Sequence, residues 1–272
     1  MDTFLPARHP VEDDIRHRIM QTLREIEQQH DITVLYACES GSRAWGFASP
    51  DSDYDVRFIY VHRLPWYLAV EPRRDVIELP ILDTLDVSGW ELRKTLQLLL
   101  RSNPVVPEWL DSPIVYMEQP KMVDHLRALT KTCFSPLKGY HHYLSMARRT
   151  FRDHMDGETV KLKKYLYALR PLLAARWIES RREQPPMRFA LLAEAMLDDA
   201  ALKEEIARLL DVKMRSGEAK FGPRWPRIHT FIETELSRLA RSEPENSPKQ
   251  PTDALDRFLM ETVLACDARQ AE

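Results

Sequence analysis

Residues 37–61 read ACESGSRAWGFASPDSDYDVRFIYV, and this stretch decides the fold. Residues 31–40 (DITVLYACES) and 53–62 (DYDVRFIYVH) are rich in β-branched, aromatic and other apolar residues, which predicts a strand at each end of the stretch. The Gly, Ser and Pro residues between them predict a turn-rich connection. The first strand ends at Gly41, where the backbone can approach a phosphate closely, and Ser42 and Arg43 add a hydroxyl and a guanidinium. The stretch therefore predicts a phosphate-binding turn between two strands.

Two carboxylates stand at the start of the second strand. Asp53 and Asp55 are two residues apart, and side chains with this spacing point to the same face of a strand. Carboxylates on one face repel each other unless a cation lies between them, and such hard oxygen ligands favour Mg²⁺ or Mn²⁺. A divalent ion, a serine-containing turn and a hydroxyl acceptor together indicate phosphoryl or nucleotidyl transfer.

Other classes of phosphate or metal site do not fit this stretch. Gly41 and Gly46 have the glycine spacing of a P-loop, but the residues that follow are Phe-Ala instead of Lys and Ser/Thr. The chain has 7 glycines in 272 residues and no G-x-G, which excludes the usual dinucleotide-binding turn. A calcium loop would require Gly where Val56 stands and Glu where His62 stands.

The rest of the chain predicts an α+β fold in two parts. Residues 11–30 have the apolar spacing of an amphipathic helix, residues 75–89 contain two strand-like stretches, and the four prolines of residues 102–120 predict a rigid irregular segment. From about residue 135 onward the pattern is helical. We therefore expect a catalytic domain with a mixed sheet and flanking helices over residues 1–120, and an all-helical domain over residues 121–272.

A basic segment is concealed by the nearly neutral net charge of −3. Residues 138–182 carry 11 basic and 4 acidic side chains, which is typical either of a solvated helix face or of a site for a partner rich in phosphate, such as RNA. Within it, Lys163, Tyr167 and Arg170 follow a helical stripe, with Lys164 one position round. An aromatic ring between cations suits the base and triphosphate of a nucleotide, although a solvated helix face has the same pattern.

The three cysteines lie far apart, which predicts neither a zinc site nor a disulfide framework. No apolar run reaches the length of a membrane helix, and the first residues lack the apolar core of a signal peptide. We expect a cytoplasmic protein that contacts no membrane.

The G-S turn, the ten-residue gap and the D-h-D strand (h is an apolar residue) resemble the signature of the polymerase-β nucleotidyltransferase superfamily. The longer string GSRAWGFASPDSDYD, followed by LDVSGWELRKTLQLLLRSNPVVPEWLDSPIVY, more closely resembles one branch, the RlaP (YcgL-like) family associated with RNA repair. This resemblance covers most of the chain. It implies a polymerase-β-like domain followed by a helical domain.

The resemblance also implies a third carboxylate on a later strand. Asp86 is the candidate, with Glu78 and Asp83 as alternatives that the spacing does not separate. Asp53, Asp55 and Asp86 would then be the catalytic metal ligands, and Gly41, Ser42 and Arg43 would hold the β- and γ-phosphates of a nucleoside triphosphate (NTP). The implied reaction transfers the nucleoside monophosphate to a hydroxyl. An RNA end is the leading acceptor, ahead of a protein side chain and a small molecule, and a non-catalytic nucleotide- or RNA-binding module is the alternative of another class.

Overall fold

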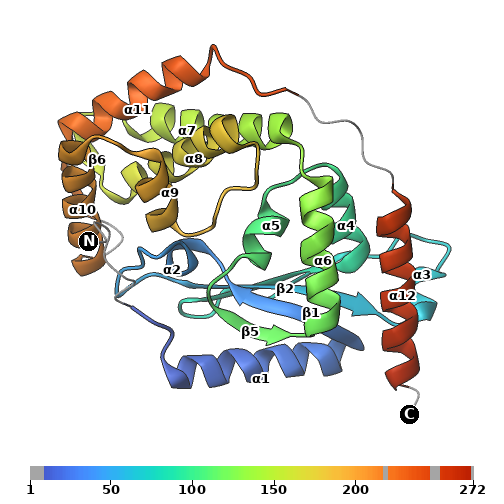
Figure 1. Cartoon of the computed structure of the whole chain (residues 1–272). Coiled ribbons are helices and arrows are strands. Elements are labelled where there is room, and N and C mark those ends of the chain that lie inside the picture. The colour runs from blue at the N-terminus through green and yellow to red at the C-terminus, as the bar shows by residue number, and fades with distance from the viewer. Residues whose placement is uncertain (1–8, 217–219, 246–251, 271–272) are drawn as a thin grey trace. The chain divides into compact units, whose positions relative to one another are not determined.

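The computed structural model describes residues 9–216, 220–245 and 252–270 and divides the chain into two compact units (Figure 1). We call residues Val11–Gly41, Asp53–Cys133 and Lys249–Glu272 the sheet unit. Residues Met1–Pro10, Ser42–Ser52 and Phe134–Pro248 form the helical unit. Residues 42–52, which connect the first two strands, are thus grouped with helices that follow much later in the chain.

The sheet unit is built on a mixed five-stranded sheet with strand order β3-β4-β2-β1-β5. β2 lies at its centre, antiparallel to β1 and parallel to β4, while β3 and β5 are antiparallel edge strands. The mixed sheet confirms the predicted α+β class. The strands are β1 (Ile32–Glu39), β2 (Tyr54–His62), β3 (Val76–Glu78), β4 (Leu85–Glu91) and β5 (Val115–Glu118).

Both faces of β1 and β2 are covered, which explains their nearly continuous apolar sequences. Helix α1 (Asp13–His30) packs its buried Ile19, Leu23 and Ile26 against the face that carries Val56 and Phe58 (Figure 1). The opposite face, which carries Ile59 and Val61, packs on several helices. These are α4 (Leu92–Leu100), α5 (Val105–Leu110), α6 (Pro120–Cys133) and α12 (Asp253–Gln270), while the short α3 (Leu64–Tyr67) follows β2.

The expectation that residues 102–120 are irregular was wrong, because α5 and β5 lie within them. Pro104 and Pro107 do not prevent α5, since they occupy its N-terminus, where backbone N–H groups have no helical partner anyway. β5 is an edge strand that pairs with β1 alone, so Pro113 and Pro120 flank it without breaking a ladder. The predicted domain boundary at residue 120 stays a prediction; α6, which begins there, and α12 both lie in the sheet unit.

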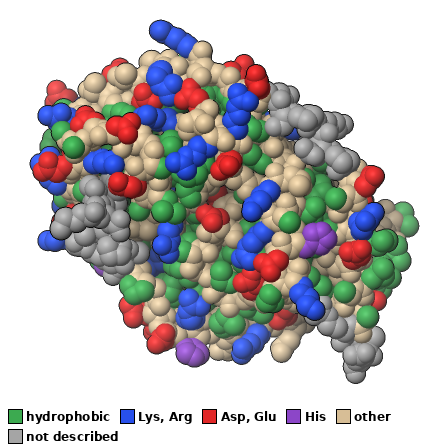
Figure 2. Space-filling view, in the orientation of Figure 1, with side chains coloured by type: hydrophobic (Ala, Val, Ile, Leu, Met, Phe, Trp, Pro, Cys, Tyr) green, Lys and Arg blue, Asp and Glu red, His purple; other side chains and the backbone are tan. Residues whose placement is uncertain are grey.

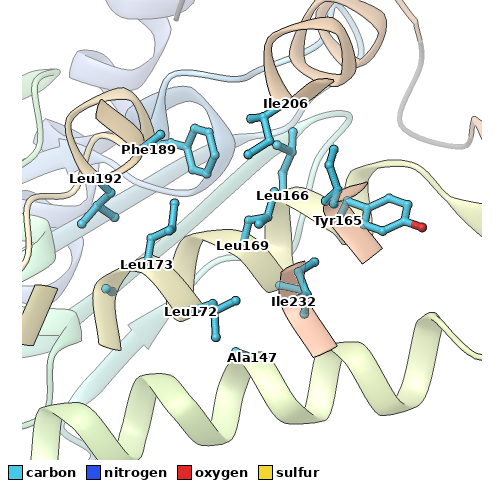
Figure 3. Packing of buried hydrophobic residues seen from close by; sticks show 14 of the residues in the cluster. Ala147, Tyr165, Leu166, Leu169, Leu172, Leu173, Phe189, Leu192, Ile206 and Ile232 are labelled. Atoms are coloured by element: carbon cyan, nitrogen blue, oxygen red, sulfur yellow. The ribbon is translucent and has the colours of Figure 1, made fainter. Parts of the chain in front are cut away.

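The helical unit is organised around α8 (Lys163–Arg181), which is buried on most of its circumference (Figure 3). Leu166, Leu169 and Leu172 contribute to a core shared with the surrounding helices, and Pro171 is accommodated inside α8. The neighbours are α7 (Pro136–His154), α9 (Phe189–Met196), α10 (Ala200–Arg215) and α11 (Pro226–Leu239), with a small hairpin of β6 (Thr159–Lys161) and β7 (Phe221–Pro223). None of the helices in the described ranges is long and apolar enough to span a membrane.

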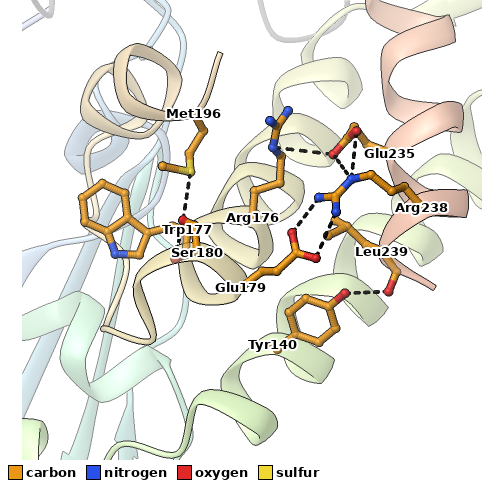
Figure 4. A network of polar contacts seen from close by, with 9 residues as sticks. All are labelled: Tyr140, Arg176, Trp177, Glu179, Ser180, Met196, Glu235, Arg238 and Leu239. Carbon is orange, nitrogen blue, oxygen red and sulfur yellow. Dashed lines mark hydrogen bonds and ion pairs between the residues drawn. The ribbon is translucent and has the colours of Figure 1, made fainter. Parts of the chain in front are cut away.

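One cation of the basic segment, Arg176, takes part in a network of ion pairs that joins α8 and α11 (Figure 4). Arg238 of α11 donates to both carboxylate oxygens of Glu179 on α8, at 2.9 and 2.6 Å, and its Nε lies 3.1 Å from Glu235. Arg176, which belongs to the basic segment, lies 3.5 Å from the same Glu235. Part of the positive charge that indicated a phosphate-rich partner is therefore used to hold α8 and α11 together.

One titrating group in the sheet unit makes stability depend on pH. His62 ends β2, and its ring stacks on that of Trp66 at 4.3 Å and 9°. Burial, followed by the charges of His30 and Arg73, lowers the pKa of His62 from 6.5 to about 4. The unfolded chain binds this proton near pH 6.5 and the folded chain only near pH 4, so acidification through this window favours unfolding. We expect His62→Phe to weaken the loss of urea resistance between pH 6.5 and 4, whereas His154→Phe, at an exposed site, should leave it as in the wild type.

Candidate active site

The two central parallel strands bring two carboxylates together. Asp55 of β2 and Asp86 of β4 are register partners, with hydrogen-bonded neighbours on either side. Adjacent strands are about 4.8 Å apart, so partners in register present their side chains on the same face as close neighbours. Asp53 lies just before β2 and is exposed, while Asp55 and Asp86 are half-buried. The structure thus juxtaposes two of the three predicted carboxylates.

Of the candidates for the third carboxylate, only Asp86 lies beside Asp55 in the sheet. Glu78 is on edge strand β3, where it pairs with Arg74 at 2.7 Å. Asp83 lies before β4 with a φ of 57°, and its exposed side chain is 3.6 Å from Arg18. This placement favours Asp86 among the three.

Arg57 joins the two carboxylates and was not singled out from the sequence. Its Nη2 donates to Asp55 Oδ1 at 3.1 Å and to Asp86 Oδ2 at 2.7 Å. Its Nη1 donates to the backbone carbonyls of Val56 and Asp86, at 3.0 and 3.1 Å. The strand alternation that aligned Asp53 with Asp55 also places Arg57 on that face, so the signal was present in the sequence.

A buried carboxylate, Glu39, fixes the backbone of Asp55. Glu39 is fully buried at the end of β1, and its Oε1 accepts the Asp55 N–H at 2.9 Å. Its Oε2 accepts the hydroxyl of Tyr116 at 2.5 Å, and its carbonyl accepts the hydroxyl of Ser112 at 2.6 Å. Burial, together with the charge of Glu39, raises the pKa of Tyr116, which keeps the phenol protonated as a donor. Glu39 therefore fixes the position of Asp55 through the backbone N–H of Asp55.

Gly41 lies directly against the side chain of Asp55. Its φ is +58°, in the left-handed region, and a Cβ atom at this position would lie 2.0 Å from Asp55 Oδ2. Glycine adopts this conformation without strain, and a residue with a side chain would not fit this contact. Where a turn was predicted, the structure has the short helix α2 (Gly41–Trp45), which begins beside Asp55 because its first residue has no side chain.

Gly41→Ala is expected to push the Asp55 carboxylate out of place and to abolish most nucleotide transfer, with a backbone cost of about 1–2 kcal/mol in unfolding free energy. Gly46→Ala is the matched control, because its φ is also positive, at +93°, but no atom lies within 4 Å of the added methyl group. Transfer assays on both variants separate displacement of Asp55 from backbone strain. Equal activity in the two variants would contradict a requirement for the Gly41–Asp55 contact.

Ser42 and Arg43, which were predicted to hold phosphates, begin the segment 42–52 of the helical unit. Both are buried, and the Arg43 guanidinium donates to the carbonyls of His9 and Ser52, at 3.2 and 2.8 Å. At the other end of the segment, the buried Lys213 Nζ of α10 lies 2.7 Å from Ser49 Oγ. Two cations thus order this segment through oxygen atoms, a role that the sequence did not indicate.

The stripe on α8 is partly buried, with Arg170 buried and Lys163, Lys164 and Tyr167 half-buried. Tyr167 lies edge-on to Trp45 at 5.4 Å, and the buried Arg170 guanidinium lies 4.6 Å from the Trp45 ring and donates to the Met187 carbonyl. Lys164 Nζ is 5.7 Å from the Tyr167 ring, and burial and the charges of Lys163 and Lys161 lower its pKa. The structure therefore brings Tyr167 and Arg170 to the segment 42–52 through Trp45. The surface view shows basic and acidic side chains interspersed on the face that it displays (Figure 2).

The carboxylate pair fits a divalent cation by its chemistry. Asp55 and Asp86 provide oxygen ligands on one face, as Mg²⁺ or Mn²⁺ prefers, and Asp53 is two residues from Asp55. Within the described ranges, no group of three or more His, Cys, Asp or Glu side chains is already clustered to hold a metal ion. Arg57 occupies the space between the two carboxylates, so the residues suit a metal once that guanidinium moves.

Comparison with known proteins adds three findings. The model of the "RNA repair pathway DNA polymerase beta family" (RlaP) matches residues 15–261. The uncharacterized protein YcgL of Bacillus subtilis (strain 168) is 48% identical over 251 residues, which cover 92% of this chain and 96% of that protein. The crystal structure of a nucleotidyltransferase-like protein from Exiguobacterium sibiricum 255-15 matches 91% of this chain and 76% of its own, with 17% identity and a TM-score of 0.30.

Proposed function

The chain belongs to the RNA repair pathway DNA polymerase beta family, and from this premise we propose that it is a metal-dependent nucleotidyltransferase that transfers a nucleoside monophosphate from an NTP to the hydroxyl of an RNA end. The observation that supports this proposal best is the register pairing of Asp55 with Asp86 on parallel strands, directly beside Gly41. The family match supports a nucleotidyltransferase-like protein, and the pair supplies the acidic centre that such chemistry requires.

In the proposed reaction, the acceptor oxygen forms a bond to the α-phosphorus of the NTP. The bond from that phosphorus to the oxygen bridging the β-phosphate breaks, pyrophosphate leaves and the hydroxyl proton passes to solvent. A divalent ion, when bound, would lower the pKa of the acceptor hydroxyl and offset the charge on the departing pyrophosphate.

The residues of the chain position these groups. Asp55 and Asp86 would hold Mg²⁺ or Mn²⁺, with Asp53 as the third ligand. Gly41 leaves room for the carboxylate of Asp55, and Glu39 fixes its backbone. Ser42 follows Gly41 in α2, where we place the β- and γ-phosphates.

The remaining predicted nucleotide contacts follow from the α8 stripe. Lys163 and Lys164 supply cations for the triphosphate in this proposal. Tyr167 and Arg170 contribute indirectly in this proposal. They contact Trp45 and so help to position the segment 42–52, which carries Arg43. RNA would be held by the solvent-facing part of the basic segment 138–182, and its affinity should fall steeply with salt.

A survey of acceptors tests this function. The protein is incubated with each of ATP, CTP, GTP and UTP labelled at the α-phosphorus, with Mg²⁺ or Mn²⁺, and with RNA, total protein or buffer alone. We expect label on RNA that has a free 3′-hydroxyl and none on the same RNA with a 3′-phosphate. Label on protein or on a small molecule would move the acceptor to that class, and no label with any NTP would favour a non-catalytic binding module.

A further inference from the structure

We propose that Arg57 is a resident cation of the carboxylate pair, which a divalent ion has to displace before the site is competent. This inference rests on the proposed function, and it adds a means of regulation to the same site. It places Arg57 as a positioning residue that keeps the site closed when metal is absent.

One nitrogen atom of Arg57 lies between the two carboxylates. Arg57 Nη2 donates to Asp55 Oδ1 at 3.1 Å and to Asp86 Oδ2 at 2.7 Å, so a single positive group bridges both carboxylates. Asp55 and Asp86 would also hold a divalent ion by their carboxylates, which this guanidinium now contacts. We therefore expect the guanidinium and the ion to compete for the pair.

The negative charges of Asp55 and Asp86 are only partly screened by solvent. Asp55 and Asp86 are 27% and 30% exposed and Arg57 is 19% exposed, so water screens the repulsion between the carboxylates only in part. Two carboxylates in register on adjacent strands repel each other, and one cation between them offsets this repulsion. Repulsion between carboxylates predicted a metal ion from the sequence, and in the structure Arg57 supplies the positive charge that offsets it.

Arg57 can leave the carboxylates without disturbing the pairing of the strands. Its Nη1 also donates to the carbonyls of Val56 and Asp86 at 3.0 and 3.1 Å, so displacement breaks these side-chain hydrogen bonds but none of the ladder between β2 and β4. The side chain is long and flexible, and its head is the part that contacts the carboxylates. A rotation of this side chain would free both oxygens and leave the register of β2 and β4 unchanged.

Mn²⁺ binding without nucleotide tests the proposal, measured by calorimetry on wild type, Arg57→Gln, Arg57→Lys and Arg63→Gln. We expect Arg57→Gln to bind Mn²⁺ at least about tenfold more tightly, because the charge-assisted hydrogen bonds from Arg57 to Asp55 and Asp86 no longer have to break. Arg57→Lys should lie between it and the wild type. Arg63→Gln is the control, because Arg63 pairs with Asp267 and Asp31 in the same unit, outside the carboxylate pair.

Thermal unfolding adds a second readout. Without metal, Arg57→Gln should unfold at a lower temperature than the wild type. Saturating Mn²⁺ should raise the melting temperature of Arg57→Gln by more than it raises that of the wild type. The double variant Asp55→Asn/Arg57→Gln should lose the gain in affinity, which would locate the ion at the pair. Equal or weaker Mn²⁺ binding by Arg57→Gln would overturn the proposal on Arg57, whereas the labelled-NTP survey judges the transferase separately.

Discussion

Asp55→Asn is expected to abolish nucleotide transfer while the protein keeps its fold. The change removes a charge but preserves the size of the side chain, and the register of β2 with β4 depends on backbone hydrogen bonds. The loss of a ligand that holds the metal should cost at least about 3 kcal/mol of transition-state stabilisation, roughly 100-fold in rate. Transfer of α-labelled nucleotide and the circular dichroism of both proteins provide the measurement.

Asp86→Asn should give the same loss, because the two residues act as one pair. The alternatives for the third carboxylate provide matched controls: Glu78→Gln and Asp83→Asn remove carboxylates that pair with Arg74 and Arg18. Both control variants should retain full activity. Full activity in Asp86→Asn, or a loss in Asp83→Asn, would refute the assignment of Asp86.

Glu39→Ala is expected to reduce both stability and transfer. It leaves the Asp55 N–H and the Tyr116 hydroxyl without the acceptor that each now has, in a fully buried position. An unsatisfied buried donor costs about 1–3 kcal/mol, so we expect the unfolding free energy to fall by several kcal/mol. Transfer should also fall because the backbone of Asp55 is no longer fixed. Urea unfolding and the transfer assay measure the two effects.

Two further variants separate stability from positioning. Tyr116→Phe removes the hydrogen bond from Tyr116 to the Glu39 side chain and leaves the Asp55 N–H bonded, so it should lose stability but retain most activity. Glu39→Gln keeps an oxygen for the Asp55 N–H and should rescue transfer in part. If Tyr116→Phe, under conditions where both variants are folded, lost as much activity as Glu39→Ala, then Glu39 would not act by fixing the backbone of Asp55.

The strand alternation of residues 53–57 predicts more of the site than its two carboxylates. The D-h-D pattern placed two carboxylates on one face, and the same period of two places Arg57 there. The resemblance indicated Asp86, which the structure places in register with Asp55. Spacing alone could not separate Asp86 from Glu78 and Asp83, because strand order is decided by pairing across the sheet.

Glu39 and the segment 42–52 could not be predicted from local sequence. Glu39 depends on Tyr116 and Ser112, which are more than 70 positions away in the chain. The segment 42–52 is ordered by Lys213 and Arg170, which belong to helices of another part of the chain. The pattern within α8 likewise predicted either a nucleotide-contacting stripe or a solvated face, but it could not show that Tyr167 packs on Trp45 or that Arg170 is buried. Tertiary contacts determined these features.

The fate of two labels tests the central claim most directly. Wild-type protein is incubated with Mg²⁺ and the acceptor that the survey selects, once with NTP labelled at the α-phosphorus and once at the γ-phosphorus. The account predicts that α-label joins the acceptor, that γ-label is released in pyrophosphate, and that Asp55→Asn does neither. Transfer of γ-label to the acceptor, or unchanged transfer by Asp55→Asn, would contradict nucleotidyl transfer at the Asp55–Asp86 pair.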